Sequence, residues 1–358
     1  MERRVEVAIV GGDLAGVATA YHLVREGIGT LLVVPPESPL RRNIDILVVH
    51  HLDYLLSKIA VRAYKQLRAK NYTEKRGALW LFQDENTLRL YEKLNKRIWG
   101  PLGATARLLP LGEIEEIYPQ INTKWYIFAA HTKEELVVDI DNLKRELLRE
   151  ARRKGLLAIT RKVKEVKTSR GRVESIILEG IGRISIDNLV VTEEAPKNIL
   201  KKTPIEKLLL ETTKTITEVE PYKYTTKPII IDYNEANFYI WQSRKGEVKI
   251  LYKTIGETTQ PTLKTLTRTS RLLSKILHGG LYLRITKTET NTTLASKTKY
   301  PIVGTNNQLP EGVYVNIGYA TVGEPIAYYT SKLLAEQITR NKTPREIEQL
   351  QPPQTKNG

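Results

Sequence analysis

Cysteine is absent from this 358-residue chain, and Met1 is its only methionine. The absence of cysteine excludes disulfide bonds, thiolate catalysis and metal sites with cysteine ligands. No apolar stretch is long enough to span a bilayer as a helix. These absences predict a cytoplasmic protein without a transmembrane segment. The scarcity of oxidation-prone residues, beside abundant Lys, Glu and Arg, is typical of proteins adapted to heat.

Acidic residues are too few to balance the basic ones: 40 Asp and Glu face 56 Lys and Arg, a net charge of +16. Such a surplus attracts anionic partners or nucleic acid without sequence preference. The basic residues are spread along the chain in short blocks such as 161–164, with no interleaved aromatic platform. We therefore expect a solvated basic surface and no specific nucleic-acid partner. A protein that binds anions or nucleic acid through its positive charge is a third interpretation, after the two functions considered below.

The remaining composition is that of a soluble globular protein, with 41% hydrophobic and 27% charged residues. A chain of this length suits one large domain or two interleaved domains. Only the last residues lack an apolar pattern, and we expect a flexible tail over 346–358.

The first thirty-five residues carry the clearest local pattern. The β-prone run Val5–Val10 leads into a turn that starts with Gly11 and Gly12, and apolar residues then recur at helical spacing over 14–26. A second apolar strand is expected at 30–34. Strand, glycine turn, helix and strand in this order are the opening of a dinucleotide-binding fold. A helix that begins directly after such a turn directs free N–H groups at one point, which suits a pyrophosphate.

The rest of the chain alternates between helical and strand patterns. A second glycine corner, from Gly318 to Gly323, follows a strand at 312–317 and precedes a helix at 325–340. Further helices are expected at 53–70, 85–99, 111–119 and 141–154, and further strands at 77–82, 156–159, 163–168, 175–178, 183–191 and within 229–251.

Several stretches, taken together, resemble the flavin-dependent oxidoreductases related to D-amino acid oxidase, sarcosine oxidase and glycine oxidase, over most of residues 5–340. The matching stretches are Val7–Gly12 with Gly16, Ile46–His51, Arg76–Leu81, Leu136–Asp139, Ile186–Val191, Tyr300–Gly304 and Gly312–Val315 with Gly318.

The resemblance implies an α/β architecture: a Rossmann-like FAD-binding domain with a discontinuous second domain built on a mixed β-sheet. The expected FAD-binding domain comprises 1–75, 130–205 and 290–345. The expected substrate domain comprises 76–129 and 206–289.

The same resemblance implies oxidation of the CH–NH group of an amino acid or related amine, with FAD as the electron acceptor. It places Tyr319 near the edge of the flavin, as a candidate catalytic residue. Tyr239 is a second catalytic candidate, from its place on a predicted strand. The backbone at Val163 would lie near the adenine. The residues expected to bind the cofactor are Gly11, Gly12, Gly16, Arg41, Arg42, Val163, Thr192, Gly318 and Gly323.

Four residues depart from the family pattern at the cofactor. Asp13 stands in place of the middle glycine, and Val34 stands where an acidic residue would grip the ribose. Glu193 and Glu194 follow the strand that ends near Val191, where small residues are expected. A carboxylate about 4 Å from a phosphate charge costs on the order of 4 kcal/mol at an effective dielectric near 20.

These departures leave two functions open. One is the FAD-dependent enzyme, acting on a small amine or amino acid. The alternative is a family member that has lost FAD binding and acts as a structural or regulatory subunit of a flavoprotein complex.

Other candidate residues carry weaker signals. His50 and His51 are expected at a helix start, on the surface or near the cofactor. Tyr239 and Trp241 share one strand face and, with Tyr252, are candidates for a pocket wall or for the core. Lys253 is a candidate for activating oxygen or for binding an anion. No metal-ligand spacing occurs, because His22, His131 and His278 stand alone, and no hydrolase pattern is present.

Overall fold

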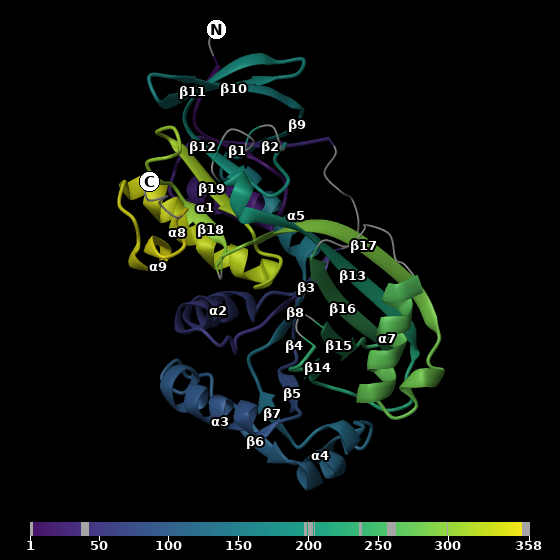
Figure 1. Ribbon diagram of the computed structural model, residues 1–358. Coiled ribbons are helices and arrows are strands. Elements are labelled where there is room, and N and C mark those ends of the chain that lie inside the picture. The colour runs from purple at the N-terminus through teal and green to yellow at the C-terminus, as the bar shows by residue number, and fades with distance from the viewer. Residues whose placement is uncertain are drawn as a thin grey trace. The chain divides into compact units, whose positions relative to one another are not determined.

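The computed structural model in Figure 1 describes residues 3–36, 43–196, 199, 203, 205–235, 238–255, 263–298 and 300–352. The chain forms two compact units. Unit 1 comprises Met1–Asp45, Val138–Leu210 and Leu294–Gly358, and unit 2 comprises Ile46–Val137 and Glu211–Thr293. The FAD-binding domain expected from the sequence includes residues 46–75 and 130–137, which belong to unit 2 in the structure.

Unit 1 is built on an eight-stranded sheet. Its central strands, β1 (Arg3–Val10), β2 (Thr30–Val34), β12 (Gly182–Thr192) and β19 (Val313–Ile317), run parallel to their neighbours in the order β2-β1-β12-β19. β9 (Leu157–Thr160) pairs parallel with β2, whereas β10 (Val163–Ser169), β11 (Arg172–Leu178) and β18 (Ile302–Gly304) pair antiparallel with their neighbours.

In unit 1, the helix α1 (Leu14–Arg25) packs against both α5 (Ile140–Arg153) and α8 (Ala327–Arg340). All four residues of Val7–Val10 are buried, which is typical of a parallel strand covered on both faces. The carboxyl ends of β1, β12 and β19 lie at one edge of the sheet, because Val10 pairs with Val191 and Thr192 pairs with Asn316. The two glycine corners therefore begin at the same edge.

Unit 2 is built on a mixed eight-stranded sheet in the order β17-β13-β16-β15-β14-β5-β7-β6. These strands are β17 (Ile285–Ser296), β13 (Leu209–Pro221), β16 (Glu247–Ile255), β15 (Phe238–Gln242), β14 (Ile229–Asp232), β5 (Ala78–Phe82), β7 (Phe128–Thr132) and β6 (Arg107–Pro110). Its helices are α2 (Tyr54–Leu67), α3 (Glu85–Leu94), α4 (Leu111–Ile117) and α7 (Leu263–Ile276).

Short elements complete the chain. A three-stranded sheet consists of β3 (Ile44–Leu47), β8 (Leu136–Asp139) and β4 (Thr73–Lys75), and the unit boundaries fall within β3 and β8. The remaining helical turns are η1 (Asn95–Trp99), η2 (Thr123–Trp125), η3 (Glu206–Leu208), η4 (Gly280–Tyr282), η5 (Glu324–Ile326) and α9 (Arg345–Glu348).

The large sheet of unit 2 has two different faces. Leu79, Ile230, Ile240, Ile250 and Tyr252 belong to a hydrophobic core that also includes Leu272 and Ile276 of α7. The opposite face is defined by a row of paired residues across five strands: Trp80, Ile231, Tyr239, Leu251 and Ile216.

The expected fold class is confirmed: a Rossmann-like parallel sheet with helices, and a second part built on a mixed sheet. The helices expected at 14–26, 53–70 and 141–154 are present within a few residues. The helix α7 and the long strands β13 and β17 were not expected from the sequence. Among the described residues, no helix is long and apolar enough to cross a membrane.

Candidate cofactor site

The glycines of the first turn are required by its geometry. Gly11 has φ +126°, and a Cβ there would lie 2.0 Å from Thr192 Oγ1. A Cβ on Gly16 would lie 2.2 Å from the carbonyl oxygen of Gly11. Both positions therefore need glycine, the first for a tight turn and the second for close packing of α1 against the strands.

Asp13 caps α1 with its carboxylate. Oδ1 accepts a hydrogen bond from the Gly16 N–H at 2.8 Å, and Oδ2 accepts from the Thr192 hydroxyl at 2.7 Å and the Glu194 N–H at 3.0 Å. Aspartate is a strong N-cap residue because its side chain satisfies a free N–H of the first turn. Burial raises the pKa of Asp13 although these three hydrogen bonds oppose the shift.

Glu194 and Glu193 bring two more carboxylates to this turn. Glu194 Oε2 accepts from the Gly12 N–H at 3.2 Å, and a carboxylate oxygen of Glu193 accepts from the Leu294 N–H. Burial and the nearby charge of Asp13 raise the pKa of Glu193 well above its ordinary value. The leading causes of these two shifts are burial, hydrogen bonds and neighbouring carboxylates.

The second glycine corner is also flanked by carboxylates. Gly318 and Gly323 have φ of +88° and +95°, and Glu324 follows directly at the start of η5. The Glu324 N–H donates to Asp45 at 3.1 Å, and the Asn43 amide donates to Glu324 Oε2 at 2.7 Å. The structure thus places acidic side chains at both corners.

Tyr319 is buried, and its hydroxyl group is engaged within unit 1. It hydrogen-bonds Asn316 and Thr330, and the Asn316 amide donates to Ser331 at 2.9 Å. Burial raises the pKa of Tyr319. These contacts tie the corner to α8, and a catalytic role for Tyr319 stays a prediction.

The other residues that the sequence singled out at the cofactor lie in different places. Val163 is buried in the core of unit 1 and pairs with Leu178. Val34 contacts the turn, because its Cγ1 lies 2.8 Å from a Cβ built on Gly12. Arg41 and Arg42 lie outside the described residues.

The opposite face of the unit 2 sheet brings together several expected substrate residues. Tyr239 and Trp241 lie on it, and the cross-strand pair Lys214 and Lys253, both buried, lies on the same face. Tyr252 does not, because it pairs with Phe238 and belongs to the core on the α7 side. The expectation of one wall containing all three aromatic residues is therefore wrong for Tyr252.

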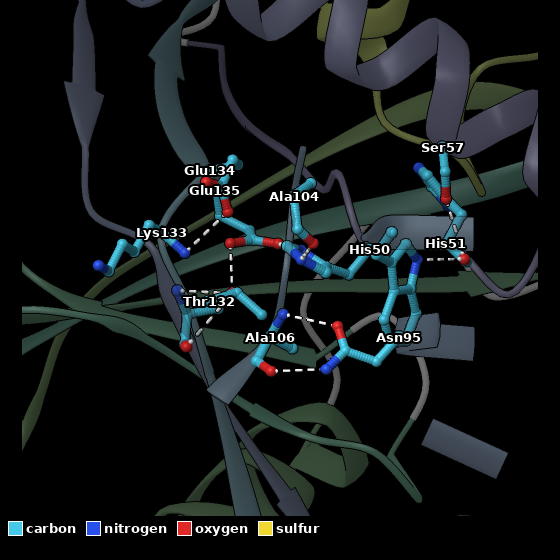
Figure 2. A network of polar contacts seen from close by, with 12 residues as sticks. His50, His51, Ser57, Asn95, Ala104, Ala106, Thr132, Lys133, Glu134 and Glu135 are labelled. Carbon is cyan, nitrogen blue, oxygen red and sulfur yellow. Dashed lines mark hydrogen bonds and ion pairs between the residues drawn. The ribbon is translucent and has the colours of Figure 1, made fainter. Parts of the chain in front are cut away.

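No clear sequence signal predicted the polar centre inside unit 2 that Figure 2 shows. His50 Nδ1 lies 2.5 Å from Glu135 Oε1, and His50 Nε2 lies 2.8 Å from the carbonyl oxygen of Ala104. The Thr132 hydroxyl donates to the other oxygen of Glu135. The expectation that the two histidines begin a helix on the surface is wrong, since α2 begins at Tyr54 and His50 is buried.

His50 and Glu135 form a buried ion pair. Burial alone would lower the pKa of His50, but the charge and hydrogen bond of Glu135 outweigh it, so the pKa is raised. Burial alone would raise the pKa of Glu135, and the His50 charge and the hydrogen bonds lower it overall. For the neighbouring His51, burial outweighs the nearby carboxylates and lowers the pKa to about 4.

Among the described residues, no group of three or more His, Asp or Glu side chains could hold a metal ion.

Comparisons with known proteins agree with this geometry. A family model described as FAD dependent oxidoreductase, DAO, matches residues 6–337. L-proline dehydrogenase from P. horikoshii superposes with a TM-score of 0.85 at 20% identity, covering 98% of this chain and 97% of that one. Glycine oxidase from Bacillus cereus superposes with a TM-score of 0.78 at 17% identity, covering 99% and 100%. No curated protein sequence matches the chain.

A sheet edge with two glycine corners, joined to a second unit on a mixed sheet, defines a flavoprotein-type oxidoreductase fold. The chain belongs to the DAO family of FAD-dependent oxidoreductases, because the family model covers nearly all of it. The family is one of enzymes, and the solved structures at this level of identity establish the shared fold.

The turn fits a dinucleotide in its backbone but not in its charges. Gly11 and Gly16 keep the tight geometry that a pyrophosphate site needs. However, the Gly12 N–H is bonded to Glu194, and the Asp13 carboxylate lies at the helix N-terminus, where an anion would bind. In the arrangement that the structure shows, the turn does not fit a pyrophosphate.

Proposed function

We propose that this protein is an oxidoreductase acting on the CH–NH group of an amino acid or related amine, with FAD as its cofactor. The observation that carries the proposal is the family match over residues 6–337, which includes both glycine corners and both units. The convergence of β1, β12 and β19 at one sheet edge supports the same conclusion. The expected cofactor residues Gly11, Gly12, Gly16, Thr192, Gly318 and Gly323 all lie in unit 1.

We further propose that Lys214 and Lys253 bind the carboxylate of an amino-acid substrate beside Tyr239. The two lysines are direct cross-strand neighbours on one face of the sheet, and both are buried. The pair places two basic side chains next to each other on the face that also carries Tyr239, which suits contact with a carboxylate. Tyr239 lies one row along the same face, and its proposed role is to contact the substrate.

A second candidate function is supported by the carboxylates of the turn. Asp13 and Glu194 take up N–H groups that a pyrophosphate would use. A family member built in this way would serve as a structural or regulatory subunit of a flavoprotein complex, without FAD of its own.

The absorption spectrum of the purified protein separates the two candidates. The enzyme should show flavin bands as purified or after incubation with excess FAD, and amino acids or amines should bleach those bands in the absence of oxygen. A colourless protein that leaves the fluorescence of added FAD unchanged would contradict the enzyme and support the subunit.

The lysine pair is tested by comparing two substrates of the same protein. Lys253→Met and Lys214→Met should each lower kcat/KM for an amino acid about 10- to 100-fold, since a hydrogen bond to a charged group contributes about 1.5–3 kcal/mol. An amine without a carboxylate should be affected far less. Lys245→Met, at an exposed position of unit 2, is the matched control. Equal losses for both substrates would argue against the assignment.

A further inference from the structure

The loop after β12 and the turn after β1 are tied together by two reciprocal hydrogen bonds. The Asp13 carboxylate accepts the N–H of Glu194, and the Glu194 carboxylate accepts the N–H of Gly12. Each acidic residue thus satisfies a backbone N–H in the other segment. The Thr192 hydroxyl adds a third bond to the same carboxylate of Asp13.

Three N–H groups of the turn have protein partners in this arrangement. The Gly11 N–H donates to the Val33 carbonyl, the Gly12 N–H to Glu194, and the Gly16 N–H to Asp13. Of these three, the Gly12 and Gly16 bonds end on carboxylate oxygens, which have the charge and the acceptor character of phosphate oxygens. The same carboxylates stabilise the positive end of the α1 dipole.

The buried turn also disfavours added negative charge. Burial is the largest cause that raises the pKa values of Asp13 and Glu193, and the neighbouring carboxylate of Glu324 adds to both shifts. A pyrophosphate would bring further negative charge to a position where burial already disfavours it. The turn is therefore stable without a pyrophosphate and unfavourable to one while Glu194 remains bonded to Gly12.

We infer that Glu194 occupies the phosphate position of this turn as a built-in anion, held there by Asp13, and that FAD binds only when Glu194 leaves the Gly12 N–H. This inference rests on the proposed FAD-dependent function and specifies how the chain's own residues regulate access to that site. Glu194 is the competing group, and Asp13 is the residue that positions it.

The experiment titrates FAD into the purified wild-type protein and its variants, with quenching of FAD fluorescence as the measurement. Glu194→Ala frees the Gly12 N–H, and Glu194→Gln removes the charge while keeping the shape. Both should bind FAD at least about tenfold more tightly than the wild type, with Glu194→Ala showing the larger gain. Glu26→Gln, at an exposed position at the other end of α1, makes the same change in net charge and should leave the affinity unchanged.

A second measurement follows thermal unfolding without and with FAD. The melting temperature of Glu194→Ala without FAD should fall below that of the wild type, and added FAD should raise it more in the variant than in the wild type. Glu194→Gln provides the comparison if the alanine variant folds poorly, because glutamine still offers an acceptor to the Gly12 N–H.

The outcomes separate this inference from the proposed function. Tight FAD binding by the wild type, unimproved in both Glu194 variants, would overturn the inference and leave the enzyme intact. Tighter binding in the variants than in the wild type would support the inference whether or not the wild type turns over substrate. No FAD binding by any variant would overturn both.

Discussion

Unit 1 and unit 2 each bury a carboxylate centre, and the carboxyl pKa values of the two centres are shifted in opposite directions. Glu135 in unit 2 faces the imidazole of His50, and its pKa is lowered. Asp13 and Glu193 in unit 1 face backbone N–H groups, a hydroxyl and one another, and their pKa values are raised. Burial disfavours charge in both units, so the difference comes from the counter-charge.

The comparison shows that hydrogen bonds alone do not replace a cation. Asp13 accepts three hydrogen bonds, yet its pKa is still raised. Glu135 accepts bonds from His50 and Thr132, and the charge on His50 brings its pKa below the ordinary value. Unit 2 thus holds a charged ion pair, whereas the carboxyl groups of unit 1 keep their protons to a higher pH than usual.

The largest expected effect comes from removing the cation of unit 2. His50→Ala leaves Glu135 buried and charged without its partner, and we expect a loss of about 3–5 kcal/mol in the free energy of unfolding. Urea denaturation followed by circular dichroism measures it. His278→Ala removes an exposed histidine of the same unit and should change stability by less than about 0.5 kcal/mol. A loss below about 1 kcal/mol for His50→Ala would mean that the pair is not charged.

A smaller effect is expected from removing the cap of unit 1. Asp13→Ala leaves three donors without their acceptor, and the expected loss is about 2 kcal/mol, the upper end of the range for an N-cap. Thermal unfolding without FAD measures it. Asp139→Ala, which removes the exposed N-cap of α5 in the same unit, should cost about 0.5–1 kcal/mol. Equal losses for the two variants would show that Asp13 only caps its helix.

The pH dependence of stability sharpens the comparison further. The pKa of Glu193 is raised in the folded protein, so its protonated form is favoured there, and its contribution to stability is complete below the ordinary glutamate pKa. That contribution is lost as the pH rises through the folded pKa, by at most about 1.4 kcal/mol for each pH unit. Glu193→Gln should remove this part of the slope.

Urea denaturation of the wild type and Glu193→Gln at pH 5, 7 and 9 tests this sign. The wild type should lose more stability than the variant between pH 5 and 9. Glu26→Gln, at an exposed site, should keep the wild-type slope. An identical slope in the wild type and Glu193→Gln would mean that Glu193 is ionised throughout.

Local patterns in the sequence were sufficient for the first glycine turn and for the helices with clear apolar spacing. The turn at Gly11 and the helices α1, α2 and α5 were predicted in this way, and the structure adds that Asp13, Asp53 and Asp139 cap these helices. The strand β13, by contrast, reads LLETTKTITEVEP, where threonine and charged residues hide the alternation. Its buried Lys214 and Thr215 are stabilised by neighbouring strands far along the chain.

The candidate site divides in the same way. The glycines and the unusual acidic residues at 13, 193 and 194 are visible in the sequence, because their types differ from what the turn normally carries. The face on which Tyr252 lies and the partner of His50 are not visible, because 85 residues separate His50 from Glu135 and register alone decides which side of a strand is buried.

The amino-acid sequence by itself determined the dinucleotide-type opening, the second glycine corner, the family and the presence of acidic residues where a phosphate would bind. Only the tertiary structure decided that Asp13 and Glu194 bond to each other's backbone segments, and that His50 and Glu135 meet inside unit 2. The physical reason is that spacing along the chain sets local backbone geometry, whereas the protonation and partners of a buried charge depend on groups that folding brings together.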